Sequence, residues 1–272
     1  MPDALPDMRA IVGDHDLVLI TLDTLRYDAA QACFERGELP VLGPHLPPGG
    51  WERRHTPGSF TYAAHAAFFA GFLPTPASPG PHPRLFALDF EGSETTAAHT
   101  YVFRDRADIV SGLRDAGYRT ICIGGVGFFN KRNPLGSQLP GLFDESHWEP
   151  GFGVTAVDST ERQVALACAR LLSEELRDTR CFVFINVSAL HQPNRHYLAG
   201  AEHDGYDSHC AALRYVDAAL APLFAALRER GRAFVIACSD HGTAYGEDGY
   251  HGHRLAHEVV MTVPYAHFIL TP

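Results

Sequence analysis

The 272-residue sequence has little lysine, no closely paired cysteines and no long apolar segment. Lys131 is the only lysine, and 22 basic residues stand against 32 acidic ones, which gives a formal net charge of -10. Broad surfaces for nucleic acid or anionic membranes need clustered cations, so this balance argues against both partners. The N-terminus has no basic start before an apolar run, and no stretch approaches the ~20 apolar residues that span a bilayer. We therefore expect a soluble, cytoplasmic protein.

The six cysteines are scattered through the sequence, and none forms a Cys-x-x-Cys pair. Disulfide frameworks and structural zinc sites show dense or paired cysteines instead. We predict reduced, mostly buried thiols, which agree with a cytoplasmic location.

Short apolar runs alternate with helical patterns along the chain. Residues 16–22, 118–124, 181–187 and 232–239 are the continuous apolar runs typical of a parallel sheet covered on both faces. Residues 158–178 and 208–231 have helical periodicity, and Asp158 and Glu161 stand at capping-box spacing. This alternation predicts a three-layer α/β/α sandwich with a mainly parallel central sheet. We expect one domain over residues 1–272.

Two of the predicted strands run directly into acidic residues. Asp23 follows the first strand, and Asp240 and His241 follow the strand at 232–239. Polar groups just past the carboxyl ends of parallel strands line the sites of open α/β sheets. Two carboxylates and an imidazole at one edge suit a divalent metal ion. The alternatives are a helix N-cap for Asp23 and a turn for the Asp-His-Gly triplet.

The segment SFTYAAHAAFFAGFLP places Thr61 at the start of a predicted helix. Free backbone N–H groups and the helix dipole favour an oxyanion or phosphate there, and a divalent cation would activate the hydroxyl as a nucleophile. Thr61 is therefore either a nucleophile or a simple helix cap. His65, four residues on, shares its helical face and is either a donor to a phosphate oxygen or leaving group, or a structural histidine.

Five segments together resemble the sulfatase-like branch of the alkaline phosphatase superfamily, from about Asp16 to the C-terminus. They are LITLDTLRYD, TYAAHAAFFAGFLP, LRDAGYRTICIGG, YVDAALAPLFAALRERGRAFVIACSDHG and VPYAHFIL. The resemblance implies the alkaline-phosphatase/sulfatase-like fold, here in a minimal version that lacks the usual C-terminal subdomain. It also implies that one metal ion is bound by Asp23, Thr61, Asp240 and His241.

Formylglycine sulfatases carry a cysteine where this sequence has Thr61 and an arginine where it has His65. They also have a Gly-Lys-Trp-His pattern that is missing here, with Gly125 in place of the lysine. The sequence therefore disfavours the formylglycine route. In having a threonine at this position, the sequence resembles the phosphodiesterases and the phosphoethanolamine or glycerophosphate transferases of the superfamily.

Several histidines are candidates for substrate binding. His191 resembles the histidine of a His-x-Pro segment that contacts substrate in sulfatases, and His251 and His253 stand where relatives carry a substrate-binding lysine or histidine. The sequence does not choose between His251 and His253. Arg26 and Asp217 belong to the family pattern, and we expect salt bridges from both.

The ligand set suits one Mn²⁺ or Zn²⁺ ion, with Mg²⁺ as an alternative. A second ion, held by histidines among His191, His196, His251, His253 and His257, is left open.

We expect a metal-dependent hydrolase that acts on a phosphate or phosphonate ester through a covalent threonyl intermediate. The alternatives are a phosphotransferase, mutase or atypical sulfatase on the same scaffold, or a non-catalytic module that binds a metal or a partner. The expected substrate is a small soluble phosphoester or a modified peptide. A homo-oligomer or a partner protein could complete the open site.

Overall fold

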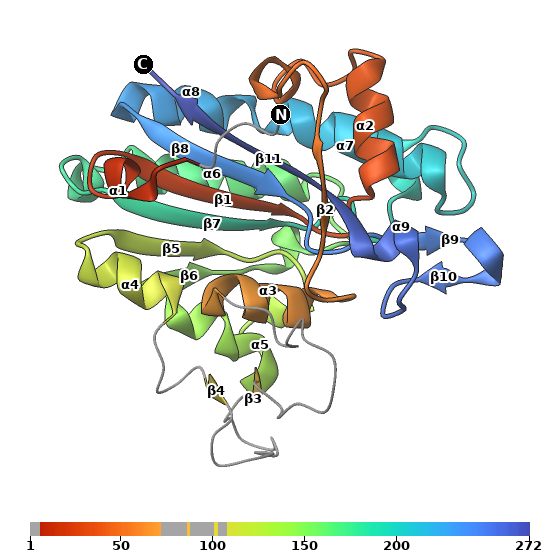
Figure 1. Ribbon diagram of the computed structural model, residues 1–272, viewed down its shortest axis with the longest axis horizontal. Coiled ribbons are helices and arrows are strands. Elements are labelled where there is room, and N and C mark those ends of the chain that lie inside the picture. The colour runs from red at the N-terminus through yellow and green to blue at the C-terminus, as the bar shows by residue number, and fades with distance from the viewer. Residues whose placement is uncertain (1–5, 72–85, 88–100, 103–107) are drawn as a thin grey trace.

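The computed structural model describes residues 6–71, 86–87, 101–102 and 108–272 (Figure 1). A seven-stranded sheet forms its centre, in the strand order β2-β11-β8-β1-β7-β5-β6. The strands are β1 (Asp16–Leu22), β2 (Glu52–His55), β5 (Arg119–Ile123), β6 (Glu145–His147), β7 (Cys181–Val187), β8 (Ala233–Cys238) and β11 (Thr262–Leu270). β8, β1, β7, β5 and β6 pair in parallel, and β11 is antiparallel to both β8 and β2. The four predicted strands are therefore four consecutive strands in the interior of the sheet.

Two small ribbons lie outside this sheet. β9 (Ala244–Tyr245) pairs antiparallel with β10 (His251–Gly252), and β3 (Phe86–Ala87) pairs in parallel with β4 (Tyr101–Val102). In Figure 1 the β9–β10 ribbon projects beyond the carboxyl ends of the central strands.

Helices cover both faces of the sheet, as expected for a three-layer sandwich (Figure 1). One layer contains α2 (Tyr27–Glu35), α6 (Ser159–Leu171), α7 (Tyr206–Ala219) and α8 (Ala221–Arg230), and the other contains α1 (Met8–Ile11), α3 (Thr61–Ala70), α4 (Ile109–Asp115) and α5 (Pro134–Gln138). The short α9 (Glu258–Met261) leads into β11. Single 3₁₀ turns are η1 (Gly43–His45), η3 (Gly127–Phe129), η4 (Pro140–Leu142), η5 (Pro150–Phe152), η6 (Glu174–Leu176), η7 (Arg195–Tyr197) and η8 (Glu247–Gly249).

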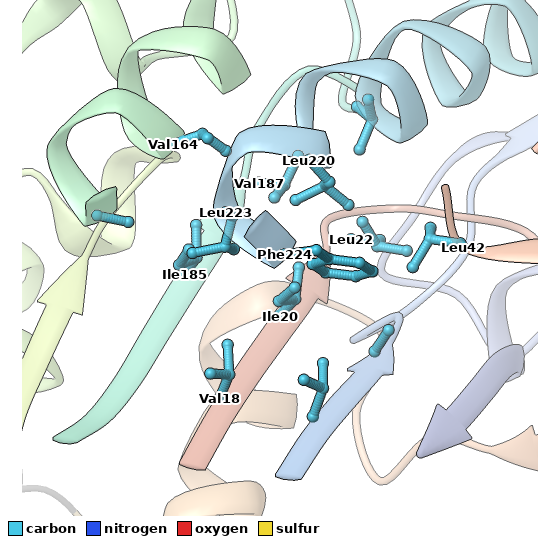
Figure 2. Packing of buried hydrophobic residues seen from close by; sticks show 14 of the residues in the cluster. Val18, Ile20, Leu22, Leu42, Val164, Ile185, Val187, Leu220, Leu223 and Phe224 are labelled. Carbon is cyan, nitrogen blue, oxygen red and sulfur yellow. The ribbon is translucent and has the colours of Figure 1, made fainter. Parts of the chain in front are cut away.

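The central strand β1 is buried on both faces, which explains its continuous apolar sequence. Val18, Ile20 and Leu22 face the layer that contains α8, and all three belong to a cluster with Leu223 and Phe224 (Figure 2). Leu17 belongs to the cluster on the opposite face, with Phe182 and Phe184 of β7. The apolar residues that give residues 208–231 their helical periodicity are all buried: Leu213, Val216, Leu220, Leu223, Phe224 and Leu227.

Residues Tyr206–Arg230 are long and apolar enough to cross a membrane by length and composition alone, which differs from the expectation that no such stretch exists. They form two helices, α7 and α8, joined at Leu220, because Pro222 cannot donate the backbone bond that would continue one helix. Of the most apolar window, 67% is buried inside the fold. In this structure the segment is a core helix pair covering the sheet.

The predicted capping box at the start of α6 is wrong. Asp158 is the N-cap residue, but its side chain makes no cap hydrogen bond. Its Oδ2 accepts a hydrogen bond of 2.8 Å from Nε of Arg162 instead, so an ion pair has replaced the cap. All six cysteines are free, and only Cys168 is not fully buried, as expected.

Candidate active site

The carboxyl ends of β1 and β8 bring together three residues that the sequence predicted as metal ligands. The two strands are parallel neighbours, with Thr21 beside Cys238. Asp23 and Asp240 therefore follow at the same edge of the sheet, with His241 next to them. All three side chains are completely buried, and one donor atom from each lies within 4.8 Å of the others.

The two carboxylates have the free oxygens that a cation site needs. Oδ1 of Asp240 accepts hydrogen bonds from the backbone N–H groups of Thr24 (3.2 Å) and His241 (3.0 Å). Its Oδ2 and Oδ1 of Asp23 are buried, and among the described residues neither has a hydrogen-bond partner. Buried polar atoms are rarely left unpaired, and two neighbouring carboxylates repel each other. A divalent cation between these oxygens would satisfy both.

Electrostatics point to the same conclusion. Burial raises the pKa of Asp240 well above its usual value, and the charge of Asp23 adds to the rise. Burial lowers the pKa of His241, so its imidazole is neutral near pH 7. A neutral imidazole with carboxylates beside it is the donor set of Zn²⁺ and Mn²⁺ sites.

His241 is oriented by the backbone of the next residue. Its Nδ1 donates to the carbonyl oxygen of Gly242 across 2.9 Å, which directs Nε2 toward the carboxylates. Nε2 lies 3.5 Å from Oδ2 of Asp240. Gly242 itself sits close under α9: its N–H donates to Val260 O (2.8 Å), and a Cβ at this position would lie 1.9 Å from Val259 O. Only glycine fits here.

Thr61 is the first residue of α3, as predicted. Its hydroxyl faces Asp23, Asp240 and His241, which we call the ligand group. Oγ1 lies 3.3 Å from Oδ2 of Asp23 and 3.3 Å from Nε2 of His241. The residue is 3% exposed and lines a cleft of about 390 Å³. Thr61 therefore connects the ligand group to the space in which a substrate can lie.

His65 lies behind Thr61 and does not line the cleft. Its Nδ1 is 2.7 Å from the backbone oxygen of Thr61, and its Nε2 is 3.0 Å from Oγ1 of Thr21. The ring is completely buried, with Phe129 and Phe184 against it. Burial lowers the pKa of His65 to about 4. This geometry favours the structural alternative, in which His65 positions the first turn of α3, over contact with a phosphate oxygen or leaving group.

The structure separates the histidines left open by the sequence. His191 and His253 line the cleft with Thr61. The His253 ring centroid is 4.7 Å from that of His241 and 5.4 Å from that of His191. His251 lies in β10 and is exposed, so it stands outside the cleft.

A backbone contact links the His253 loop to the Thr61 segment. The N–H of Arg254 donates to the carbonyl oxygen of Ser59 across 2.8 Å, one residue after His253 and two before Thr61.

His196 and His257 stand apart from the ligand group. His196 is exposed and packs on Tyr197, and Nε2 of His257 is 3.1 Å from Oδ2 of Asp248. Within the part of the chain that the structure describes, only one group of three or more residues could hold a metal ion, namely Asp23, Asp240 and His241.

Sequence reasoning missed Asn186, the buried polar residue near the end of β7. Its Nδ2 donates to Oδ2 of Asp23 across 3.0 Å, and its Oδ1 accepts from the backbone N–H of Val126 across 3.0 Å. An amide inside an apolar strand, at the second-last position, is the signal that could have revealed it.

Arg26 pairs with Asp28 at 2.6 Å and also contacts Glu247, as expected. The expected salt bridge of Asp217 is wrong. Its two carboxylate oxygens accept hydrogen bonds from the backbone N–H groups of Val41 (2.9 Å) and Leu42 (2.8 Å). This side chain holds a loop in place, and it forms no ion pair with a basic side chain of the described residues.

The family model for sulfatases matches residues 16–265. The chain belongs to the sulfatase family. Its fold and this match place it in the sulfatase-like branch of the alkaline phosphatase superfamily, as the sequence motifs predicted. No curated protein sequence matches the chain.

Solved structures share the fold at low sequence identity. The C-terminal periplasmic domain of EptC from Escherichia coli, in complex with Zn, has a TM-score of 0.64 at 12% identity and covers 96% of this chain and 74% of that chain. The corresponding domain of phosphoethanolamine transferase EptC from Campylobacter jejuni has a TM-score of 0.63 at 14% identity, covering 95% and 82%. The PsFucS1 sulfatase from Pseudoalteromonas sp. has a TM-score of 0.58 at 14% identity, covering 96% and 63%.

Proposed function

We propose that this protein is a metal-dependent hydrolase that cleaves a phosphate or phosphonate ester through a covalent intermediate on Thr61. The observation that carries the proposal is the position of Thr61 Oγ1, which lies 3.3 Å from both Asp23 Oδ2 and His241 Nε2 and lines the cleft. A helix cap would need no such contact with two metal-binding side chains.

Asp23, Asp240 and His241 would hold one divalent ion, with Thr61 as a fourth ligand, and the proposed ion is Mn²⁺ or Zn²⁺. When bound, the ion would favour the alkoxide of Thr61 and offset negative charge on the phosphoryl group. The Zn complex of the E. coli EptC domain is consistent with this choice.

The chain's own residues then perform the transfer. Thr61 Oγ1 loses its proton and forms a bond to phosphorus while the bond from phosphorus to the ester oxygen breaks, and the leaving oxygen takes up a proton. The free N–H groups at the start of α3 favour the negative phosphoryl oxygens. His191 and His253 line the same cleft and are placed to contact those oxygens or the leaving group. Water then cleaves the Thr61 ester and regenerates the hydroxyl.

A second candidate is transfer of the group to an alcohol instead of water. It is favoured by the fold shared with the domain named as a phosphoethanolamine transferase. The formylglycine route of sulfatases is disfavoured because Thr61 stands where those enzymes carry a cysteine.

The cleft of about 390 Å³ fits a small phosphoester or the modified side chain of a peptide. We keep a soluble substrate, a cytoplasmic location, and the absence of nucleic-acid and membrane partners as part of the proposal. The absence of nucleic-acid and membrane partners rests on the net charge of -10 and on the single lysine, and the cytoplasmic location rests on the scattered cysteines.

The test uses metal-stripped protein resupplied with Mn²⁺ or Zn²⁺ and four aryl substrates: a phosphate monoester, a phosphodiester, a phosphonate and a sulfate. Thr61→Ala should lose turnover, and Thr61→Ser should keep part of it. Mass spectrometry after an acid quench should find the transferred group on the peptide that contains Thr61. Turnover that persists in Thr61→Ala would refute the threonyl route, and product formed only with an added alcohol would favour the transferase.

A further inference from the structure

A large hollow lies away from Thr61, at the β6 edge of the sheet. Its volume is about 670 Å³. β6 is the last strand in the sheet order, and the walls of the hollow come from the end of β6, the segment after it and the first turns of α6. Small-molecule sites commonly measure ~300–1,000 Å³. Lys131, Trp148, Phe152, Arg162 and Leu166 line this one.

Positive charge without an ion-pair partner among the described residues lies at one side of the hollow, at Lys131. Arg162 is balanced, because it pairs with Asp158 at 2.8 Å and lies 3.9 Å from Glu149. Lys131 and Arg132 are exposed, and no described carboxylate pairs with either. The ammonium group of Lys131 only donates to the carbonyl oxygen of Ser146, across 2.9 Å. Within the described ranges these two neighbouring cations have no ion-pair partner, on a chain with a net charge of -10.

The backbone around Lys131 holds its side chain at the hollow, with Arg132 beside Trp148. Lys131 has a φ of 57°, a left-handed conformation that is uncommon for a residue other than glycine. Its N–H donates to Gly136 O across 3.1 Å, and the N–H of Arg132 donates to Oδ1 of Asn130 across 2.9 Å. The conformation is therefore fixed by hydrogen bonds on both residues.

Trp148 supplies a flat apolar wall in a fixed orientation. Its Nε1 donates to Gly125 O across 2.9 Å, so its polar atom is already satisfied. The guanidinium of Arg132 lies 4.5 Å from the ring centroid. Such a contact holds a cation beside an aromatic surface. Phe152 and Leu166 add further apolar surface.

We propose that this hollow binds a flat organic anion. The ring of the ligand lies against Trp148, Phe152 and Leu166, and its phosphate or carboxylate group pairs with Lys131, with Arg132 adding positive potential beside it.

The hollow shares a wall with the reactive cleft. Lys131 lines the hollow, and the preceding residue, Asn130, lines the cleft. In the same way, Phe152 lines the hollow and Val154 lines the cleft. Trp148 bonds to Gly125, and the next residue, Val126, bonds to Asn186. The anion is thus either the distant part of the phosphoester substrate or a separate effector. Only the first source rests on the proposed function.

The binding test follows tryptophan fluorescence in the Thr61→Ala protein, which prevents turnover of the probe. The probes are adenosine 5′-monophosphate and 2-naphthoate, with adenosine and inorganic phosphate as controls. Trp148 is partly exposed and Trp51 is buried, so quenching should come from Trp148 and disappear in Trp148→Phe. The two flat anions should quench, and the uncharged nucleoside and free phosphate should quench far less.

Lys131→Gln should weaken binding of both anions by about tenfold, since it removes a charged hydrogen bond. The matched control is Arg232→Gln, an exposed cation that directly precedes β8, at the opposite ends of the strands; it should not change the affinity. Equal quenching by adenosine, an unchanged affinity in Lys131→Gln, or no quenching by either anion would each overturn the proposal.

Steady-state kinetics on the unmodified protein then identify the source of the anion. If the hollow holds part of the substrate, 2-naphthoate raises KM for an aryl ester and leaves kcat unchanged. If it holds an effector, 2-naphthoate changes kcat. Both effects should be lost in Lys131→Gln. A protein without turnover still gives the binding result, so failure of the proposed function is distinguished from failure of this site.

Discussion

The side-chain amide of Asn186 donates a hydrogen bond of 3.0 Å to Oδ2 of Asp23, the same oxygen that lies 3.3 Å from the hydroxyl of Thr61. One buried donor thereby fixes which oxygen of Asp23 faces Thr61 and which is left for a cation.

Asn186→Ala should lower both metal affinity and kcat/KM by about 10- to 100-fold, the usual cost of losing a residue that orients a metal ligand. Metal affinity is measured by calorimetry and activity with the aryl esters. The matched control is Ser188→Ala, which removes a different buried hydrogen bond, to Phe152 O, from the segment just after β7. Equal losses of metal affinity and kcat/KM in the two variants would mean that Asn186 contributes only packing and does not orient Asp23.

Replacing His253 or His251 by glutamine tests the division that the structure makes between them. His253→Gln should reduce kcat/KM by at least about tenfold, because this ring lines the cleft beside His241. His251→Gln should leave the rate unchanged, since that side chain is exposed on β10. The reverse pattern would mean that the β9–β10 ribbon adopts another arrangement when substrate binds.

Asp240→Asn should have opposite effects on stability and on metal binding. Without metal, two buried carboxylates face each other, and burial together with Asp23 raises the pKa of Asp240. A neutral amide removes that repulsion, so the Tm of the chelator-treated variant should rise above that of the unmodified chain. Added Mn²⁺ or Zn²⁺ should raise the Tm of the unmodified chain only. A lower Tm in the chelator-treated variant would contradict this account.

His209 should make the fold sensitive to acid. It is completely buried, and burial, followed by the charge of Arg26, lowers its pKa to about 3 despite the opposing charge of Asp28. Its ring accepts a hydrogen bond from the N–H of Arg26 and faces Tyr245 and Asn194.

An unfolded histidine takes up a proton near pH 6.5, whereas folded His209 stays neutral until the pH falls to about 3. Its stabilising contribution is therefore complete above pH 6.5 and decreases as the pH falls toward 3. Linkage gives a loss of about 2 kcal/mol in the free energy of unfolding between pH 7 and pH 5. His209→Gln should remove this part of the loss in urea titrations, and the exposed His55→Gln should not. Identical pH profiles for all three proteins would rule the effect out.

The part of the site that the sequence predicted comes from regular structure. Asp23 and Asp240 follow apolar strands, and parallel strands place their carboxyl ends together, so these residues could be brought together without coordinates. Thr61 was found in the same way, because the start of a helix is marked by the pattern that follows it. The layered fold follows from the same alternation of periods.

The remaining features depend on side-chain direction and on irregular segments. His65 shares a helical face with Thr61, but the start of α3 turns that face toward β1. There Nε2 of His65 contacts Oγ1 of Thr21. The choice between His251 and His253 is made by the short β9–β10 ribbon, which no periodicity indicates. The hollow beside Lys131 combines the end of β6, the segment after it, the first turns of α6 and a left-handed residue, and one sequence does not reveal how such segments meet. The single domain over residues 1–272 stays a prediction.

The close packing of Gly242 under α9 also limits how this protein can change over evolutionary time. The site's aspartate and histidine sit directly before a position where even one methyl group collides with the backbone oxygen of Val259. Because that oxygen belongs to the main chain, no side-chain replacement nearby can make room. Substitution of Asp240 or His241 can change the chemistry while the fold is kept. Substitution of Gly242 first disrupts the turn that positions these two side chains. Among descendants of this chain, Gly242 should therefore outlast the catalytic activity itself.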